Sequence, residues 1–171
     1  FQRCWAESKR PGAVFVANVA APVLNQQIAG WMRHNWALTP SFLVSEAESF
    51  GVKNAYSKPE QLGVDRWLTL IAVHKRYSTS ACIVDGGTAI TIDVIREDGQ
   101  HLGGLILPGF ELMRGALLTN THIPRVEPIK SALDLLGRDT ESAVASACIN
   151  SAAALVERVL KSATEELGKQ P

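Results

Sequence analysis

The chain lacks an excess of charge of either sign. Its 171 residues include 17 basic and 17 acidic side chains, so the formal net charge is zero. Proteins that bind nucleic acid or an acidic membrane through electrostatics usually carry a basic balance or a basic patch. The composition therefore indicates neither nucleic acid nor a membrane as a partner. It is compatible with a small anionic substrate, for which one or two local arginines suffice.

Cysteine is scarce too. Cys4, Cys82 and Cys148 occur without a Cys-x-x-Cys pair, which excludes a disulfide framework and favours a reducing, cytoplasmic environment. Cys82 falls in an apolar strand and Cys148 on a helix, where we expect both thiols to be core residues. No apolar run approaches the length needed to cross a bilayer, and no charged-then-apolar leader opens the chain.

Several signatures of common enzyme classes are also missing. The chain contains no GxxxxGK[ST] loop, no GxGxxG loop and no GxSxG elbow. Its four histidines (His34, His74, His101 and His122) do not show the spacing of metal ligands. These absences argue against a Walker-type or dinucleotide site, a serine-hydrolase elbow and a zinc site.

Strand and helix patterns alternate along the chain, with enough apolar residues for a packed core. The length suits one ordinary domain or an intimate pair of half-domains. We expect strands at residues 13–19, 41–44, 81–84, 89–95 and 101–107, and helices at 23–36, 59–77, 110–118 and 140–167. We also expect an irregular loop at 45–56, turns at 85–87 and 97–100, and a loop at Pro124 and Pro128. In the strand at 89–95, Ile90, Ile92 and Val94 should point inward. This order predicts an α/β layered domain with one central hairpin.

The first candidate site is the pair Asp65 and Arg66, near the start of a predicted helix. A carboxylate can take the proton from an attacking hydroxyl, and a guanidinium can bind an anionic substrate. Gly63 would give close access to the backbone, and Tyr56 offers a hydroxyl just upstream. A pair of charges on a helix surface is the simpler interpretation of any single Asp-Arg dipeptide.

The second candidate site is the sequence Asp-Gly-Gly-Thr at residues 85–88, which follows an apolar strand. Gly86 and Gly87 allow backbone N–H groups to face an anion, and the hydroxyl of Thr88 adds a hydrogen bond. Asp85 could hold a cation at the end of the strand. A glycine-rich hairpin corner explains the same residues without a ligand.

Two further segments have simpler structural explanations. The sequence HLGGLILPG, residues 101–109, is typical of a bulged strand followed by a helix that begins after proline, although a close approach of backbone to substrate would also use its glycines. The sequence GRDT, residues 137–140, is typical of a helix cap, with Asp139 or Thr140 as the N-cap residue.

Four segments together resemble a known family. In chain order they are NAYSKPEQLGVDRW, IVDGGTAITIDVI, GGLILPGFELMRGAL and GRDTESA. They are similar to type III pantothenate kinase, the family that includes the Bvg accessory factor. The resemblance extends from about residue 13 to the last helix, and the shared order and spacing of four motifs make it far more specific than any one of them.

The resemblance implies an acetate and sugar kinase/Hsp70/actin-like (ribonuclease H-like) fold of the α/β class, with two related halves around a nucleotide cleft, and a homodimer. Residues 1–80 would form the remainder of the N-terminal half with the GVDR segment. Residues 81–171 would form the C-terminal half with the DGGT turn and the long helix. The implied reaction is ATP-dependent phosphorylation of pantothenate to 4′-phosphopantothenate, the first step of coenzyme A synthesis. The implied cofactors are ATP with Mg²⁺ and a monovalent cation, K⁺ or NH₄⁺.

The resemblance also assigns substrate contacts to particular residues. Asp65 corresponds to the catalytic base that activates the pantothenate hydroxyl. Gly63, Val64 and Arg66 complete the substrate-binding GxDR segment. Tyr56 matches a tyrosine that contacts substrate.

The remaining roles implied by the resemblance concern ATP, a cation and the dimer. Asp85 matches the ligand of the monovalent cation, and Thr88 matches a contact to the ATP phosphates, next to Gly86 and Gly87. Thr140 matches a threonine that contacts substrate at a site shared across the dimer. Phosphoryl transfer depends mainly on positioning and on neutralising charge, so these residue types suit the implied reaction.

Two segments of the family pattern are expected outside the sequence. A DxGNT-type strand and turn, which organises ATP phosphates and magnesium, would precede Phe1, and a glycine-rich motif on the adenosine side would follow Pro171. We therefore expect the chain to cover the middle of a longer protein. Two alternatives stay open: a catalytically weak regulatory or accessory protein on the same scaffold, and a related kinase or phosphatase acting on another small alcohol or on polyphosphate.

Overall fold

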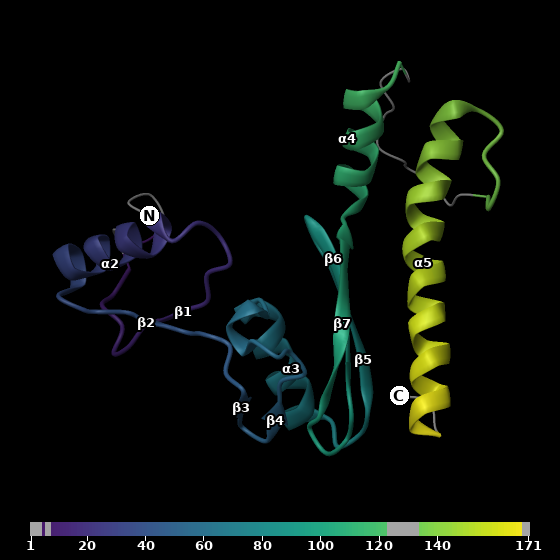
Figure 1. The fold of residues 1–171 in the computed structure, drawn as a ribbon. Helices are drawn as coiled ribbons and strands as arrows, with labels where there is room; N and C mark the ends of the chain where they lie inside the picture. The colour runs from purple at the N-terminus through teal and green to yellow at the C-terminus, as the bar shows by residue number, and fades with distance from the viewer. Residues whose placement is uncertain (1–4, 6–7, 123–133, 169–171) are drawn as a thin grey trace.

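The structure, a computed structural model, describes residues 5, 8–122 and 134–168 (Figure 1). Strands and helices alternate along this part of the chain, which confirms the mixed α/β class. The strands are β1 (Phe15–Val16), β2 (Ser41–Phe42), β3 (Glu48–Ser49), β4 (Val52–Lys53), β5 (Ala81–Gly86), β6 (Ala89–Ile95) and β7 (His101–Pro108). The helices are α2 (Val23–Trp36), α3 (Val64–Arg76), α4 (Phe110–Asn120) and α5 (Thr140–Leu167), with a 3-10 turn η1 at Pro59–Gln61. The loop expected at Pro124 and Pro128 lies outside the described residues.

The largest sheet is an antiparallel meander in the order β5-β6-β7. Two smaller sheets precede it in the chain: β1 pairs with β2 in parallel, and β3 pairs with β4 as a hairpin. In Figure 1, α3 and α5 lie on opposite sides of the β5-β6-β7 sheet, and α4 continues from the end of β7. The central strand β6 is therefore covered on both faces.

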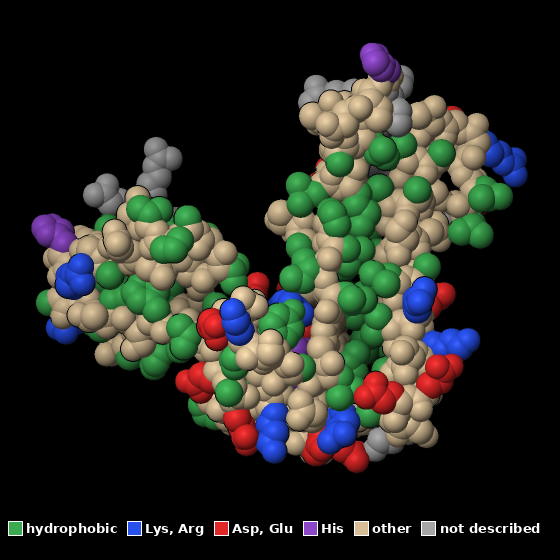
Figure 2. Space-filling model, in the orientation of Figure 1, with side chains coloured by type: hydrophobic (Ala, Val, Ile, Leu, Met, Phe, Trp, Pro, Cys, Tyr) green, Lys and Arg blue, Asp and Glu red, His purple; other side chains and the backbone are tan. Residues whose placement is uncertain are grey.

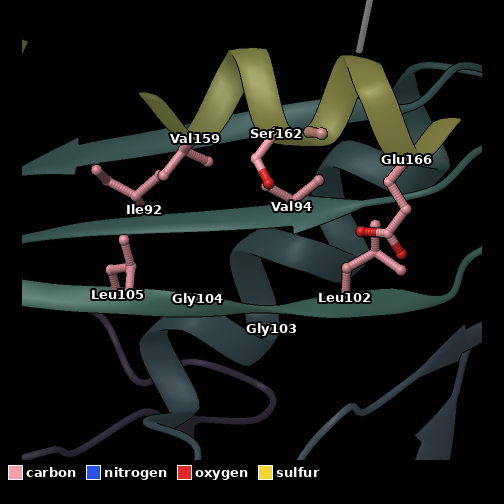
Figure 3. Close-up of a pocket in the computed structure, with 10 residues that line it drawn as sticks. Ile92, Val94, Leu102, Gly103, Gly104, Leu105, Val159, Ser162 and Glu166 are labelled. Carbon is pink, nitrogen blue, oxygen red and sulfur yellow. The ribbon is translucent and has the colours of Figure 1, made fainter. Parts of the chain in front are cut away.

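The alternation of side chains along β6 explains how both of its faces are used. Ile90, Ile92 and Val94 are buried, as the sequence predicts, and the last two line a cavity of about 380 Å³ against α5 (Figure 3). On the opposite face, Asp93 and Ile95 are buried as well. A strand with two buried faces is expected to be almost continuously apolar, so a carboxylate there requires partners.

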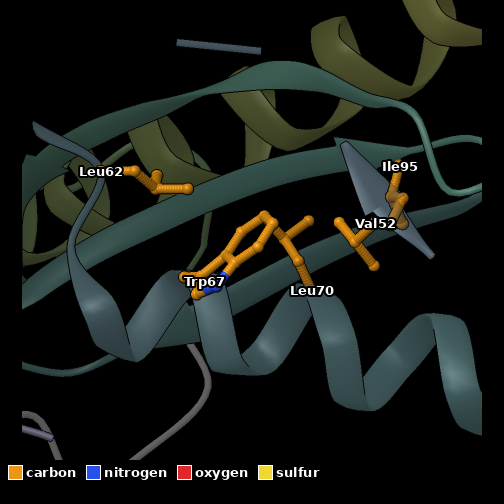
Figure 4. Close-up of a cluster of buried hydrophobic side chains, with 5 residues drawn as sticks. All are labelled: Val52, Leu62, Trp67, Leu70 and Ile95. Atoms are coloured by element: carbon orange, nitrogen blue, oxygen red, sulfur yellow. The ribbon is translucent and has the colours of Figure 1, made fainter. Parts of the chain in front are cut away.

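The main hydrophobic cluster lies between α3 and this second face of the sheet (Figure 4). Trp67 and Leu70 from α3 meet Val52 of β4 and Ile95 of β6, and Leu62 closes the end of the cluster next to Gly63. Burying each large apolar side chain contributes roughly 1.5–3 kcal/mol. The cluster thus fixes the position of α3, and with it the residues at the start of that helix.

The structure shortens the strands expected at 13–19 and 41–44 to two residues each, and it differs from the expected elements in three further places. The helix expected at 59–77 is divided, because η1 ends at Gln61 and α3 begins at Val64 after a break at Gly63. The expected loop at 45–56 contains the β3-β4 hairpin. Strand β5 continues through Asp85 and Gly86, so that the turn expected at 85–87 is formed by Gly87 and Thr88. A regular strand pairing can include Asp and Gly where tertiary contacts outweigh their low strand propensity.

The cap of α5 and the burial of Cys148 agree with the sequence, whereas Cys82 is less buried than expected. Asp139 is the N-cap residue of α5, and its side chain and that of Ser142 form a reciprocal capping box. Cys148 is buried and Cys82 is half-buried, and both are free thiols within the described residues. The expectation that no apolar run is long enough to cross a bilayer is wrong for α5, which has the length and the apolar composition required. Core helices can share both properties.

Candidate active site

The start of α3 presents Asp65 to solvent. Gly63 is the N-cap residue of the helix, and Asp65 lies in the first turn with an exposed side chain. A Cβ atom at Gly63 would lie 2.5 Å from Oδ1 of Asp65, so only the absence of a side chain leaves room for the carboxylate in this position. Oδ1 also accepts a 2.8 Å hydrogen bond from the backbone N–H of Arg66. The helix dipole favours negative charge here, so the carboxylate is both fixed and accessible, as a general base must be.

A cavity of about 290 Å³ opens next to this helix start. Its walls include Val19 and Val44, just beyond the ends of the parallel strands β1 and β2, together with Gly63 and Val64. Ligands of α/β proteins commonly bind outside the carboxyl ends of parallel strands. The structure therefore places Gly63 and Val64 in the wall of a cavity of a size that suits a small molecule.

Arg66 faces away from the neighbouring Asp65 and into the protein. Its guanidinium forms a forked ion pair with Asp93 of β6, with Nε to Oδ2 at 2.8 Å and Nη2 to Oδ1 at 2.6 Å. Both side chains are almost fully buried, at 6% and 4% exposure. A forked pair fixes the plane of the guanidinium as well as its position. The pair therefore joins the first turn of α3 to the central strand of the sheet.

The electrostatics of the pair follow from this geometry. Burial by itself would raise the pKa of the Asp93 carboxyl, but hydrogen bonds from His101 and Arg66 and the positive charge of Arg66 outweigh it and lower that pKa. For Arg66, burial acts to lower the pKa of the guanidinium, and the hydrogen bonds to Asp93 and Tyr56 raise it overall. Both groups are therefore charged in the folded protein at neutral pH.

Tyr56 and His101 complete the surroundings of Arg66. The hydroxyl oxygen of Tyr56 accepts a 3.2 Å hydrogen bond from Nη1 of Arg66. The ring of Tyr56 stacks on that of His101, with centroids 6.2 Å apart and planes inclined by 16°. Nε2 of the fully buried His101 lies 2.9 Å from Oδ1 of Asp93. Tyr56 and Arg66, both predicted to contact substrate, are thus brought together by Asp93 and His101, for which the sequence analysis predicted no role.

Asp85 lies close to this group, across a small cavity. The cavity has a volume of about 10 Å³, roughly what one water molecule or small cation needs. Arg66 and Thr69 line it from α3, and Asp85, Thr91 and Asp93 line it from the sheet. The Asp85 side chain is exposed and has no hydrogen-bond partner in the described part of the chain. Those residues contain no cluster of three or more acidic, histidine or cysteine side chains, so a cation at Asp85 would need backbone, hydroxyl or ligand oxygens as its other contacts.

The turn between β5 and β6 is exposed and adjoins the start of α4. Gly86, Gly87 and Thr88 are all exposed, and the backbone N–H of Gly109 donates a 2.8 Å hydrogen bond to the carbonyl of Thr88. Gly109 is the N-cap residue of α4, so the unpaired N–H groups of that helix start close to the turn. A glycine turn beside a helix N-terminus is a suitable place for phosphate oxygens.

Thr140 is not brought to Asp65. It is the first residue of α5, and Figure 1 shows this end of the helix beside α4, far from α3 along the sheet. Because Asp139 provides the cap, the exposed hydroxyl of Thr140 is not used for capping and has no partner among the described residues.

The sequence analysis did not identify the two residues that hold Arg66 in place, Asp93 and His101. Asp93 had a detectable signal, because it is an acidic residue in the apolar strand AITIDVI and shares a face with Thr91 and Ile95. His101 carried no comparable signal. Its role depends on the pairing of β7 with β6, which brings it within reach of a residue eight positions earlier.

Comparisons with known proteins identify the family. The family model described as type III pantothenate kinase matches residues 1–162. The chain belongs to the type III pantothenate kinase family. The resemblance of the four sequence segments is thereby confirmed.

Three curated type III pantothenate kinases illustrate the similarity. The protein from Nitrosococcus oceani is 40% identical over 92% of this chain and 61% of its own length. Those from Alcanivorax borkumensis and Halorhodospira halophila are 38% and 41% identical, over 88% and 85% of this chain and 60% and 57% of their own lengths. The chain thus spans about three-fifths of the length of the curated type III pantothenate kinases that it matches.

A solved structure supports the fold. The crystal structure of a conserved Baf family protein from Campylobacter jejuni matches with a TM-score of 0.59 at 22% identity, over 88% of this chain and 65% of that one. At this identity the likeness concerns the fold of this pantothenate kinase family member and not its activity.

Proposed function

We propose that the complete protein phosphorylates pantothenate with ATP to give 4′-phosphopantothenate, the first step of coenzyme A synthesis. The observation that carries the proposal is the arrangement at the start of α3. The exposed Asp65 and the buried Arg66, whose guanidinium donates to the hydroxyl of Tyr56, are successive residues of one helix turn. A base next to donors for an anionic group suits an acceptor with both a hydroxyl and a carboxylate, and pantothenate has both.

The acceptor side of the site uses the first turn of α3. Asp65 accepts the proton of the pantothenate hydroxyl as its oxygen attacks the γ-phosphorus of ATP. Arg66 and Tyr56 bind the carboxylate of pantothenate, while Gly63 and Val64 form part of the wall against its carbon chain. Their positions around one helix start support this division of roles.

The ATP side of the site uses the turn between β5 and β6. Thr88, Gly86 and Gly87 contact the phosphates, and the nearby start of α4 adds favourable backbone dipoles. Asp85 is the ligand of a monovalent cation, K⁺ or NH₄⁺, and its free carboxylate fits that role. ATP would bring Mg²⁺, whose charge neutralises the phosphate oxygens during transfer.

The architecture proposed for the complete protein is an acetate and sugar kinase/Hsp70/actin-like fold with halves at 1–80 and 81–171, working as a cytoplasmic homodimer. Two observations support the dimer. Thr140 lies far from Asp65 within one chain, so it would complete the site of a second copy (Figure 1). Figure 2 shows apolar side chains gathered over β7 and α4, where Ile106, Phe110 and Leu112 are exposed.

The direct test is an assay of the complete, purified protein with ATP and pantothenate. We expect ATP-dependent formation of 4′-phosphopantothenate, detected by mass spectrometry, with a higher rate in K⁺ or NH₄⁺ than in Na⁺. Replacing Asp85 by Ala should remove the difference between these cations. Absence of product in every salt would refute the proposed function, and a rate independent of the cation would refute the role of Asp85 alone.

Replacing Gly63 by Ala should lower kcat by about 100-fold, since displacing a catalytic group by about 1 Å has effects of this size. The new Cβ would meet Oδ1 of Asp65 at 2.5 Å and push the carboxylate away from its position. The backbone angles of Gly63, φ −53° and ψ 132°, are accessible to alanine, so the stability of the fold should change little.

The matched control is Gly30→Ala in α2, where an added Cβ would meet nothing within 4 Å. That variant should keep the wild-type kcat. Steady-state kinetics and thermal unfolding of the two variants separate the effects, and an unchanged kcat in Gly63→Ala would show that Gly63 does not position Asp65.

A further inference from the structure

We propose that Asp93 and His101 are positioning residues, which hold Arg66 and Tyr56 in the arrangement that binds the carboxylate of the acceptor. The inference rests on the proposed function and deepens it. It concerns residues that lie one layer behind the substrate contacts, on β6 and at the start of β7.

Asp93 determines which donors Arg66 can offer. A guanidinium has five N–H groups. Two are used by the oxygens of Asp93 and one by the hydroxyl of Tyr56. One N–H of Nη1 and one of Nη2 remain, and an acceptor carboxylate that reaches them would find them already oriented. Without Asp93 the long side chain would have several rotamers in place of one.

Tyr56 is positioned by Arg66 and His101. Because its oxygen accepts the hydrogen bond from Arg66, its own O–H is free to donate to an anion. Its ring lies against that of His101, and the backbone N–H of the preceding residue, Ala55, donates to Nδ1 of His101 at 3.4 Å. Since Nδ1 accepts, Nε2 carries the hydrogen and donates it to Asp93. His101 thus ties the segment that carries Tyr56 to the aspartate that holds Arg66.

The packing around the pair favours a positioning role over a purely stabilising one. A buried ion pair is commonly no more stable than apolar side chains of the same volume, so its presence suggests a specific orientation. At Gly104 of β7, an added Cβ would lie 2.2 Å from Oδ1 of Asp93 and 2.3 Å from Nη2 of Arg66. The backbone of β7 therefore lies directly against the pair and keeps water from one side of it.

The test is a kinetic comparison of Asp93→Asn with wild type in the complete protein. We expect the KM for pantothenate to rise by about 100-fold, while the KM for ATP stays within about 3-fold and kcat falls by less than about 10-fold. The matched control is Ile92→Ala, one position away on the opposite face of β6, which removes core packing without touching the pair. It should lower stability and leave both KM values unchanged.

A second pair of variants covers the case in which Asp93→Asn does not fold. His101→Gln keeps an N–H donor and should retain a KM for pantothenate within about 3-fold of wild type, whereas His101→Leu should raise it by about 10-fold or more. Equal KM values for these two variants, or a KM in Asp93→Asn that matches Ile92→Ala, would overturn the inference and leave the proposed function intact. A wild-type protein that does not phosphorylate pantothenate would overturn both.

Discussion

Replacing Asp65 by Asn should reduce the rate of pantothenate phosphorylation by about 10²–10⁴-fold, the usual contribution of general base catalysis. Asparagine has nearly the same shape but cannot accept the proton of the attacking hydroxyl. Because the proposed role of the exposed Asp65 side chain is to take the proton during the transfer step, the loss should appear in kcat, with the KM for both substrates close to wild type. Stopped assays of product formation at saturating ATP and pantothenate measure the change in kcat.

The control for this experiment is Glu48→Gln, the same kind of change at an exposed acid of β3 that lines none of the cavities described above. It should leave kcat unchanged. Thermal unfolding of Asp65→Asn should be close to wild type, since a carboxylate in the first turn of a helix contributes only about 0.3–1 kcal/mol. A variant that retains the wild-type rate would remove Asp65 from the role of base.

Local sequence was enough to predict most of the elements. The alternation in 89–95 predicted a strand with Ile90, Ile92 and Val94 inward, because residues two apart share a face. The helices at 23–36 and 140–167 were predicted with their observed ends, since apolar spacing and end signals such as the cap at Asp139 are local features. Errors arose where tertiary contacts decided the outcome, as at the hairpin hidden in 45–56.

The candidate site, too, was predicted where its residues are local in sequence and missed where they are distant. The segments around Asp65 and Asp85 were found because each is a short run of chemically distinctive residues. The partner of Arg66 was not found, because Asp93 lies 27 positions away and reaches it only after α3 packs on the sheet. Sequence reasoning assigned Arg66 to substrate alone, whereas the structure shows that most of its guanidinium is engaged by the protein. Long-range pairing of this kind has no local signal.

Replacing Asp93 by Asn should lower the free energy of unfolding by about 3–5 kcal/mol near pH 7, because removing one partner leaves a buried charge uncompensated. Arg66 would keep its charge, and at 6% exposure its guanidinium would gain little hydration in place of the lost carboxylate. The matched control is Asp98→Asn, since Asp98 forms a similar forked pair with Arg96 on the surface. Solvent screens that pair, so its loss should change stability far less. Chemical denaturation of both variants measures the difference.

The loss of stability caused by Asp93→Asn should also depend on pH in a defined direction. Against the effect of burial, His101 of β7 and Arg66 of α3 lower the pKa of Asp93. Burial and then the charge of Asp93 raise the pKa of Cys82 of β5, and Asp85 lines the same small cavity as Asp93. A carboxyl whose pKa is lower in the folded state stabilises the fold above its unfolded pKa, near 3.9, and loses that contribution as the pH falls through the folded value. The difference in free energy of unfolding between wild type and Asp93→Asn should therefore be largest at neutral pH and should decrease below about pH 4. If this difference in free energy stays constant down to pH 3, or increases as the pH falls, the charge of Asp93 is not what stabilises the pair.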